Sequence, residues 1–219
     1  ELENDPNIEY AQPNYQYYSM SIPTNDPLRG YLWGLDNTGQ VVEDTTGLAD
    51  KDIDAPEAWR TFERNNNPII VAVIDTGVEY NHPDLVNNMW DGTNCVSDSG
   101  NALGGCLHGY DFAENNKFPL PNSIQIDGID TPPHGTHVAG IIDAEKDNGT
   151  GVIGVAPQAK IMALKVDFTT AQIVKAINFA ERNGAKIINA SWGGSSTDSV
   201  MLEAISNFSG LFITAAGNG

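Results

Sequence analysis

The chain has 219 residues, of which 11 are Lys or Arg and 29 are Asp or Glu, so its formal net charge is −18. This charge argues against a nucleic-acid or anionic-lipid partner, because phosphate groups would be repelled by most of the surface; it favours cationic partners, bound cations or simply a solvated acidic surface. Apolar residues make up 40% of the chain, which predicts one folded domain, yet no apolar run approaches the roughly 20 residues of a membrane span.

The composition at the two ends of the chain indicates where a folded domain begins and whether it is complete. Residues 1–20 are polar and aromatic and show no helical period, so we expect an extended tail or linker there. The sequence begins at Glu1 rather than at Met, and it ends directly after a strand-like run. We therefore expect a fragment in which residues 21–219 form the N-terminal part of a folded domain.

From residue 55 onward, strand-like and helix-like patterns alternate. A continuous, largely β-branched run at 69–74 is typical of a parallel strand buried on both faces. Irregular structure is expected at 22–50 and, apart from one strand, at 87–133. The expected helices are 55–62, 134–146, 170–182 and 198–208, and the expected strands are 69–74, 107–112, 160–166, 186–190 and 211–215. Because the links in the second half are short, the predicted fold class is α/β, with a doubly wound, mainly parallel sheet flanked by helices.

Three polar residues are expected at the carboxyl edge of that sheet, where such folds place their sites. Asp75 ends the first buried strand, His134 opens a helix, and Asn218 follows the last strand. An Asp can orient a His, the His can take a proton from a nucleophile, and an Asn amide can stabilise a developing oxyanion. Each residue alone is more often a cap, core or surface residue, so only their combination predicts catalysis.

Five motifs, in chain order, resemble those of subtilisin-like serine peptidases, the subtilase family. They are Val71-Ala-Val-Ile-Asp-Thr-Gly-Val78 with His82-Pro-Asp-Leu85, His134-Gly-Thr-His-Val-Ala-Gly140, Gly154-Val-Ala-Pro157, Asn189-Ala-Ser-Trp-Gly-Gly194 and Ala215-Ala-Gly-Asn218. The resemblance implies a subtilisin-like fold, incomplete at its C-terminus. It also implies that Asp75 orients the His134 imidazole, that His134 is the general base and that Asn218 donates a hydrogen bond to the oxyanion. The order Asp, then His, then a later Ser is that of subtilisin.

The resemblance also implies an activity and a substrate site. In the family the nucleophile lies in a Gly-Thr-Ser-x-Ala motif after the oxyanion Asn, and this sequence contains no such motif. We expect a serine endopeptidase whose Ser lies beyond this chain; an inactive fragment, or a pseudopeptidase that binds peptides in the same cleft, is the alternative. Ser191, Trp192 and Gly193 would bind polypeptide substrates through their backbone, as an added strand. The spacing of His134 and His137 does not fit a zinc peptidase, which needs His at i and i+4.

Further expectations concern the compartment and partners. Cys95 and Cys106 bracket a flexible loop, which in an exported enzyme favours a disulfide and an oxidising, extracellular compartment; two free thiols are the alternative. By resemblance, the tail of residues 1–20 is the end of an inhibitory propeptide, an intramolecular inhibitor of a zymogen, with a plain acidic linker as the alternative. We expect a monomer without a nucleic-acid or membrane partner.

The resemblance finally implies structural calcium as a cofactor. Calcium takes six to eight oxygen ligands, which flexible backbone can gather. The Gly-rich stretch at 145–152 would turn several carbonyl groups inward, and a solvated Asn-Gly turn is the alternative. The implied ligands are the side chains of Asp26, Asp84 and Asn148 and the carbonyl groups of Lys146, Thr150 and Val152.

Overall fold

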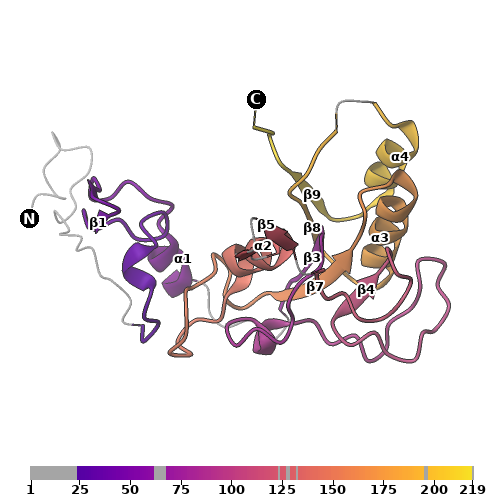
Figure 1. The fold of residues 1–219 in the computed structure, drawn as a ribbon, viewed down its shortest axis with the longest axis horizontal. Helices are drawn as coiled ribbons and strands as arrows, with labels where there is room; N and C mark the ends of the chain where they lie inside the picture. Colours follow the sequence, from indigo (N-terminus) through magenta and orange to yellow (C-terminus); the bar gives the residue numbers. More distant parts are fainter. Residues whose placement is uncertain are drawn as a thin grey trace, which may run out of the picture.

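The computed structural model describes residues 24–61, 68–122, 124–126, 129–131, 133–194 and 197–218. The expected propeptide tail of residues 1–20 lies outside them. The central feature is a five-stranded sheet in the order β4-β7-β3-β8-β9, in which every neighbouring pair is parallel (Figure 1). Its strands are β3 (Ile70–Asp75), β4 (Gly109–Asp111), β7 (Lys160–Lys165), β8 (Ile187–Ala190) and β9 (Leu211–Thr214).

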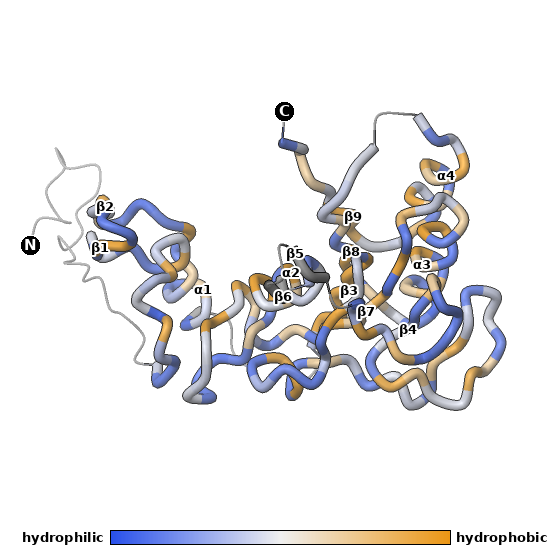
Figure 2. The backbone as a smooth tube through the Cα atoms, in the orientation of Figure 1, coloured by the Kyte–Doolittle hydropathy of each residue, from blue (hydrophilic) through white to orange (hydrophobic). Residues whose placement is uncertain are grey.

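Helices cover both faces of this sheet, so the predicted α/β class is confirmed. They are α2 (His134–Asp143), α3 (Thr170–Arg182) and α4 (Ser199–Asn207). Alternate residues of β3 explain the two layers: Val71 and Val73 pack with α2, whereas Ala72 and Ile74 pack with α3. Figure 1 shows α2 on one side of the strands and α3 with α4 on the other. Figure 2 shows that the central strands are mainly hydrophobic, as burial on both faces requires.

The remaining elements are short and lie mostly outside the sheet. They are η2 (Arg29–Tyr31), β1 (Val41–Val42), β2 (Thr45–Thr46), α1 (Ala55–Thr61), η3 (Val86–Asn88), β5 (Ile124–Ile126) and β6 (Ile129–Thr131). Residues 24–61 lie on the side of α2 that faces away from α3 and α4 (Figure 1). No helix in the described ranges is long and apolar enough to cross a membrane.

Most expected boundaries hold to within one or two residues, and α3 begins and ends as predicted. The expected helix at 134–146 was too long, because Ala144 already has extended backbone (ψ 138°) and its carbonyl accepts from Gly154 N–H. The short hairpins β1-β2 and β5-β6 were also missed, since both lie in stretches that were expected to be irregular.

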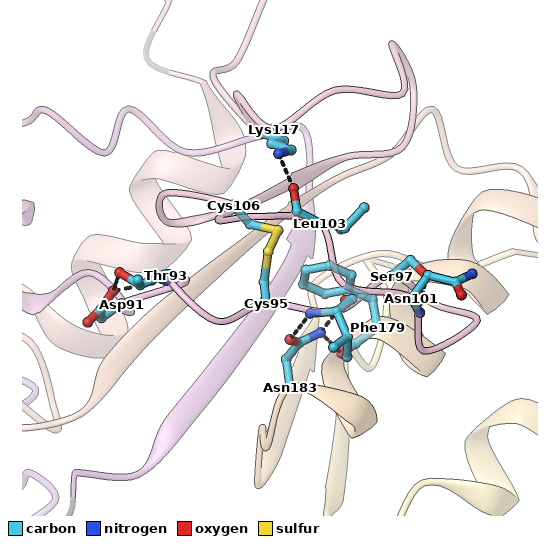
Figure 3. Close-up of a disulfide and its surroundings, with 11 residues drawn as sticks. Asp91, Thr93, Cys95, Ser97, Asn101, Leu103, Cys106, Lys117, Phe179 and Asn183 are labelled. Atoms are coloured by element: carbon cyan, nitrogen blue, oxygen red, sulfur yellow. Dashed lines mark hydrogen bonds between the residues drawn. A yellow bond between two sulfur atoms is a disulfide. The ribbon is translucent and has the colours of Figure 1, made fainter.

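A disulfide between Cys95 and Cys106 closes the loop before β4, with Cα atoms 5.8 Å apart (Figure 3). Asn183, at the end of α3, fixes this loop with two bonds: its Oδ1 accepts from Val96 N–H and its Nδ2 donates to the Val96 carbonyl, both at 2.9 Å. The loop is therefore attached to the helical layer as well as closed on itself.

Candidate active site

Asp75 is the last residue of β3, in the middle of the sheet, and it is completely buried. Its Oδ1 accepts from the backbone N–H of Thr76 at 2.7 Å, which fixes the carboxylate at the strand end. The strand itself is held from the other side, because the Trp192 indole N–H donates to the Ile74 carbonyl at 2.7 Å. The side chain is thus a rigidly placed acceptor at the carboxyl edge of the sheet.

His134 is the first residue of α2, and it faces this carboxylate. Its Nδ1 lies 2.8 Å from Asp75 Oδ1 and 2.9 Å from Oδ2. Because an ionised carboxylate only accepts hydrogen bonds, Nδ1 carries the proton, which leaves Nε2 as the free base. The His134 side chain is 54% exposed, so the ring is open to a reacting molecule. A buried acid with an exposed, oriented imidazole is suited to general-base chemistry.

The close approach of α2 to β3 depends on Gly135. Its N–H donates to the Thr76 hydroxyl at 3.1 Å. A Cβ at this position would overlap the Gly77 carbonyl oxygen and would lie 3.0 Å from the Cβ of Asp75. The glycine therefore allows the start of the helix to reach the strand end, and that contact sets the position of His134.

The predicted substrate residues follow β8 on the same edge. Ser191 Oγ accepts a hydrogen bond from the Asn189 side chain at 2.8 Å. The Trp192 and Phe168 rings pack edge-on, with their centroids 6.1 Å apart. Gly193 is exposed, and a Cβ placed there would meet nothing within 4 Å, so its backbone is open.

Asn218 lies four positions beyond the end of β9 and is exposed. Gly217, just before it, has φ +90°, a conformation that glycine adopts without strain. The hydrogen bonds of the described residues join Asp75 to His134 but do not join Asn218 to either of them. The structure thus brings two of the three predicted catalytic residues into contact.

The predicted calcium ligands gather around the loop at 145–152. Asp84 Oδ1 accepts from Asn148 Nδ2 at 2.8 Å, and its Oδ2 accepts from Val152 N–H at 2.9 Å. Asp26 accepts from the N–H groups of Asp147 and Asn148 at 2.8 and 3.1 Å. The structure therefore connects both predicted carboxylates to the same loop.

The other two predicted ligands belong to the loop itself. Thr150 donates its N–H to Asn148 Oδ1 at 2.7 Å. The Lys146 ammonium forms an ion pair with Asp147, so this side chain turns to its neighbour and only its carbonyl remains as a ligand candidate.

The chemistry of this cluster fits an oxygen-bound cation. Asp26 and Asp84 are 4% and 3% exposed, and in the described part of the chain neither has a Lys or Arg partner. Buried carboxylates normally have a counter-charge. Gly151 adds room, because a Cβ there would overlap Asp84 Oδ2. Among the described residues no group of three or more His, Cys, Asp or Glu could hold a metal ion, so amide and carbonyl oxygens would have to complete a calcium shell.

Two buried residues beside the site were missed by the sequence analysis. Lys165 ends β7 next to Asp75, and Asp111 ends β4 next to Lys165; the two form an ion pair at 2.9 Å. Lys165 lies within a strand that was predicted, but its charge gave no signal because a Lys at a strand end is usually solvated. Asp111 likewise lies within a predicted strand, at 107–112, and an acidic residue near a strand end gave no signal of its own.

A parallel sheet with an Asp–His pair at its carboxyl edge, the Asp first in the chain, is the arrangement of subtilisin-like proteins. The model of the subtilase family, Peptidase_S8, matches residues 66–219. The chain belongs to the subtilase family, and the predicted family is confirmed.

Individual relatives agree with this assignment. A thermophilic serine proteinase of Bacillus sp. (strain AK1) is 32% identical over 99% of this chain and 46% of its own length. Thermitase of Thermoactinomyces vulgaris is 34% identical over 76% of this chain and 52% of its own. The crystal structure of an Aeromonas sobria serine protease, in complex with its chaperone, superposes with a TM-score of 0.68 at 26% identity, covering 91% of this chain and 33% of that protein. The chain spans about half the length of the curated relatives it matches.

Proposed function

We propose that this protein is a serine endopeptidase and that Asp75, His134 and Asn218 belong to its catalytic machinery. The observation that supports this most directly is the hydrogen bond from the exposed His134 ring to the completely buried Asp75. In a structural role, a buried carboxylate would not need a partner whose other nitrogen remains open to solvent.

In the proposed reaction, Nε2 of His134 removes the proton from a serine hydroxyl as the oxygen attacks the peptide carbonyl. Asp75 holds the imidazole in the Nδ1–H tautomer and stabilises the imidazolium, which then gives its proton to the leaving amine. The Asn218 amide donates to the oxyanion. We place the serine outside these residues, because the sequence contains no Gly-Thr-Ser-x-Ala motif.

Polypeptide substrates would add a strand along Ser191, Trp192 and Gly193. The open backbone at Gly193 supports this mode, since main-chain groups rather than side chains then supply most of the contacts. The indole of Trp192 ties this segment to β3, so the peptide would be held in register with the Asp75–His134 pair.

The test is labelling of the full-length protein, including the serine that we place outside these residues, by a fluorophosphonate probe, which reacts only with an activated serine. His134→Ala is expected to abolish labelling. The matched control is His137→Ala, because His137 is exposed on the same helix and takes no part in the proposed reaction. Undiminished labelling of His134→Ala would overturn the role of His134. Peptide binding without any labelling of the unaltered full-length protein would instead favour a pseudopeptidase.

We also propose that the cluster around Asp84 holds structural calcium, with Asp26, Asp84 and Asn148 as side-chain ligands and Lys146, Thr150 and Val152 as carbonyl ligands. When bound, the ion would neutralise the two buried carboxylates and fix the segment that contains Asp26. The paired cysteines support an extracellular location, because disulfides persist in oxidising compartments. Residues 1–20 are proposed to act as an intramolecular inhibitor of a monomeric zymogen.

A further inference from the structure

Three polar side chains lie in register across neighbouring strands beside the proposed active site. Asp75 of β3 pairs with Lys165 of β7, and Lys165 pairs with Asp111 of β4. Paired residues of adjacent parallel strands face the same side of a sheet. Val73 and Ala163, two residues earlier, pack in the layer with α2, so the three polar side chains also emerge on the α2 face.

The order of charges across this row is minus, plus, minus, and all three groups are buried. Asp111 is 1% exposed and Lys165 is 5% exposed, while Asp75 is completely buried. The Lys165 ammonium lies 2.9 Å from Asp111 Oδ2 and 3.0 Å from Asn122 Oδ1. It is therefore bound on the side of β4, away from the carboxylate that His134 uses.

The alternative pairing would disturb the active site. Neighbouring strands lie about 4.8 Å apart, and a lysine side chain is long and flexible enough to reach the carboxylate on either neighbour. An ammonium that bound Asp75 would compete with His134 Nδ1 for the same oxygens. We propose that Asp111 is a positioning residue, which retains the Lys165 ammonium and so keeps it from competing with His134 for the Asp75 carboxylate.

The two oxygens of Asp111 have separate tasks, which makes the idea testable. Oδ1 accepts from the N–H groups of Ala113 and Glu114, both at 2.9 Å, and fixes the turn after β4. Oδ2 alone binds Lys165. Asp111→Asn can retain the first set of bonds through its carbonyl oxygen, while its NH₂ group cannot accept from an ammonium.

The experiment compares Asp111→Asn, Lys165→Met and the double variant in the full-length protein. The first readout is the low-field NMR resonance of the His134 Nδ1 proton, which reports its bond to Asp75 without any need for turnover. The second is the rate of fluorophosphonate labelling. We expect Asp111→Asn to lose the resonance and to label at least about 10-fold more slowly. Lys165→Met and the double variant should resemble the unaltered chain, because no ammonium is left to compete.

A normal resonance in folded Asp111→Asn would overturn the proposal, and so would a double variant as impaired as Asp111→Asn. If Asp111→Asn does not fold, Asn122→Ala removes only the second oxygen that holds the ammonium; a weakened or shifted resonance would then support the proposal, and an unchanged one would overturn it. The positioning role rests on the proposed peptidase function, but the two can fail separately. A resonance that responds as expected in a full-length protein that never labels would reject the peptidase function alone.

Discussion

The two ends of α2 hold polar groups by different means. At the N-terminal end, the backbone of α2 lies so close to the segment after β3 that residue 135 has to be a glycine. This close approach brings His134 to Asp75. At the C-terminal end, the helix ends at Asp143 and the loop at 145–152 follows. Backbone N–H groups of this loop donate hydrogen bonds to the buried carboxylates of Asp26 and Asp84. The first arrangement is steric and the second is electrostatic. Substitutions that add volume should therefore act on the first, whereas ions and pH should act on the second.

The helix dipole adds to this difference. The C-terminal end of a helix carries partial negative charge, so it disfavours nearby anions. Two buried acids nevertheless lie near this end: Asp143 is the last residue of α2, and Asp84, from the segment before η3, accepts hydrogen bonds from the loop that follows the helix. We expect a bound cation to balance Asp84, whereas burial favours the protonated form of Asp143.

The largest effect is expected from Gly135→Ala. The added methyl group would overlap the Gly77 carbonyl, so α2 must move away from β3 and carry His134 with it. Overpacking of this kind costs about 1–3 kcal/mol of stability, and a displacement near 1 Å at a reacting group reduces rates by about 10²-fold. Fluorophosphonate labelling and thermal unfolding of the full-length protein would measure both effects.

The matched control for this substitution is Gly140→Ala on the same helix. A Cβ at Gly140 would meet nothing within 4 Å, so the variant should fold and label as the unaltered chain does. It should also gain slightly in stability, because alanine is the better helix former. Equal behaviour of the two alanine variants would show that close packing at Gly135 does not set the site.

The sequence predicted the N-terminal end of α2 better than the C-terminal end, for a physical reason. The buried run before Asp75 and the helix that begins at His134 are local patterns, and parallel strands bring their ends to one edge. The early end of the helix at Asp143 depends instead on the loop that packs against it. Likewise, either of two carboxylates lies within reach of Lys165, and only the tertiary structure shows that Asp111 is its partner.

A smaller effect, confined to the C-terminal end, is expected from calcium. A ligand at 100 times its Kd stabilises the folded state by about 2.7 kcal/mol, so a chelator should lower the thermal midpoint of the unaltered chain. Asp84→Ala should lower the midpoint too, and it should remove the response to calcium. An unchanged midpoint in chelator would reject the proposed ion.

Glu145→Gln provides the control for Asp84→Ala. The Glu145 side chain lies in the same part of the loop but accepts from Asn87 and is not a proposed ligand. Its variant should keep the full response to calcium. If instead both variants respond equally well, calcium binds elsewhere.

The last expected effect concerns a proton at the same end of α2, and it is graded with pH. Asp143 is completely buried, and within the described residues its Oδ2 has no hydrogen-bond partner, while Oδ1 accepts from Asn88 Nδ2 at 3.0 Å. Burial raises the pKa of Asp143 from 3.8 to about 8, although Lys160 opposes the shift. The folded chain therefore keeps this proton at neutral pH, at a position where an anion would also face the negative end of the helix.

The raised pKa makes a specific prediction for stability. Below about pH 4 the acid is protonated in both states; between pH 4 and pH 8 only the folded state keeps the proton, so the free energy of unfolding should fall as pH rises, by up to about 1.4 kcal/mol per pH unit. Asp143→Asn stays neutral and can keep the bond from Asn88, so it should flatten this slope and be the more stable chain at pH 7. Glu203→Gln removes a charge from the exposed surface of α4 and should leave the slope unchanged. Chemical unfolding at several pH values measures it, and parallel slopes for Asp143→Asn and the unaltered chain would show that Asp143 ionises as freely when folded as when unfolded.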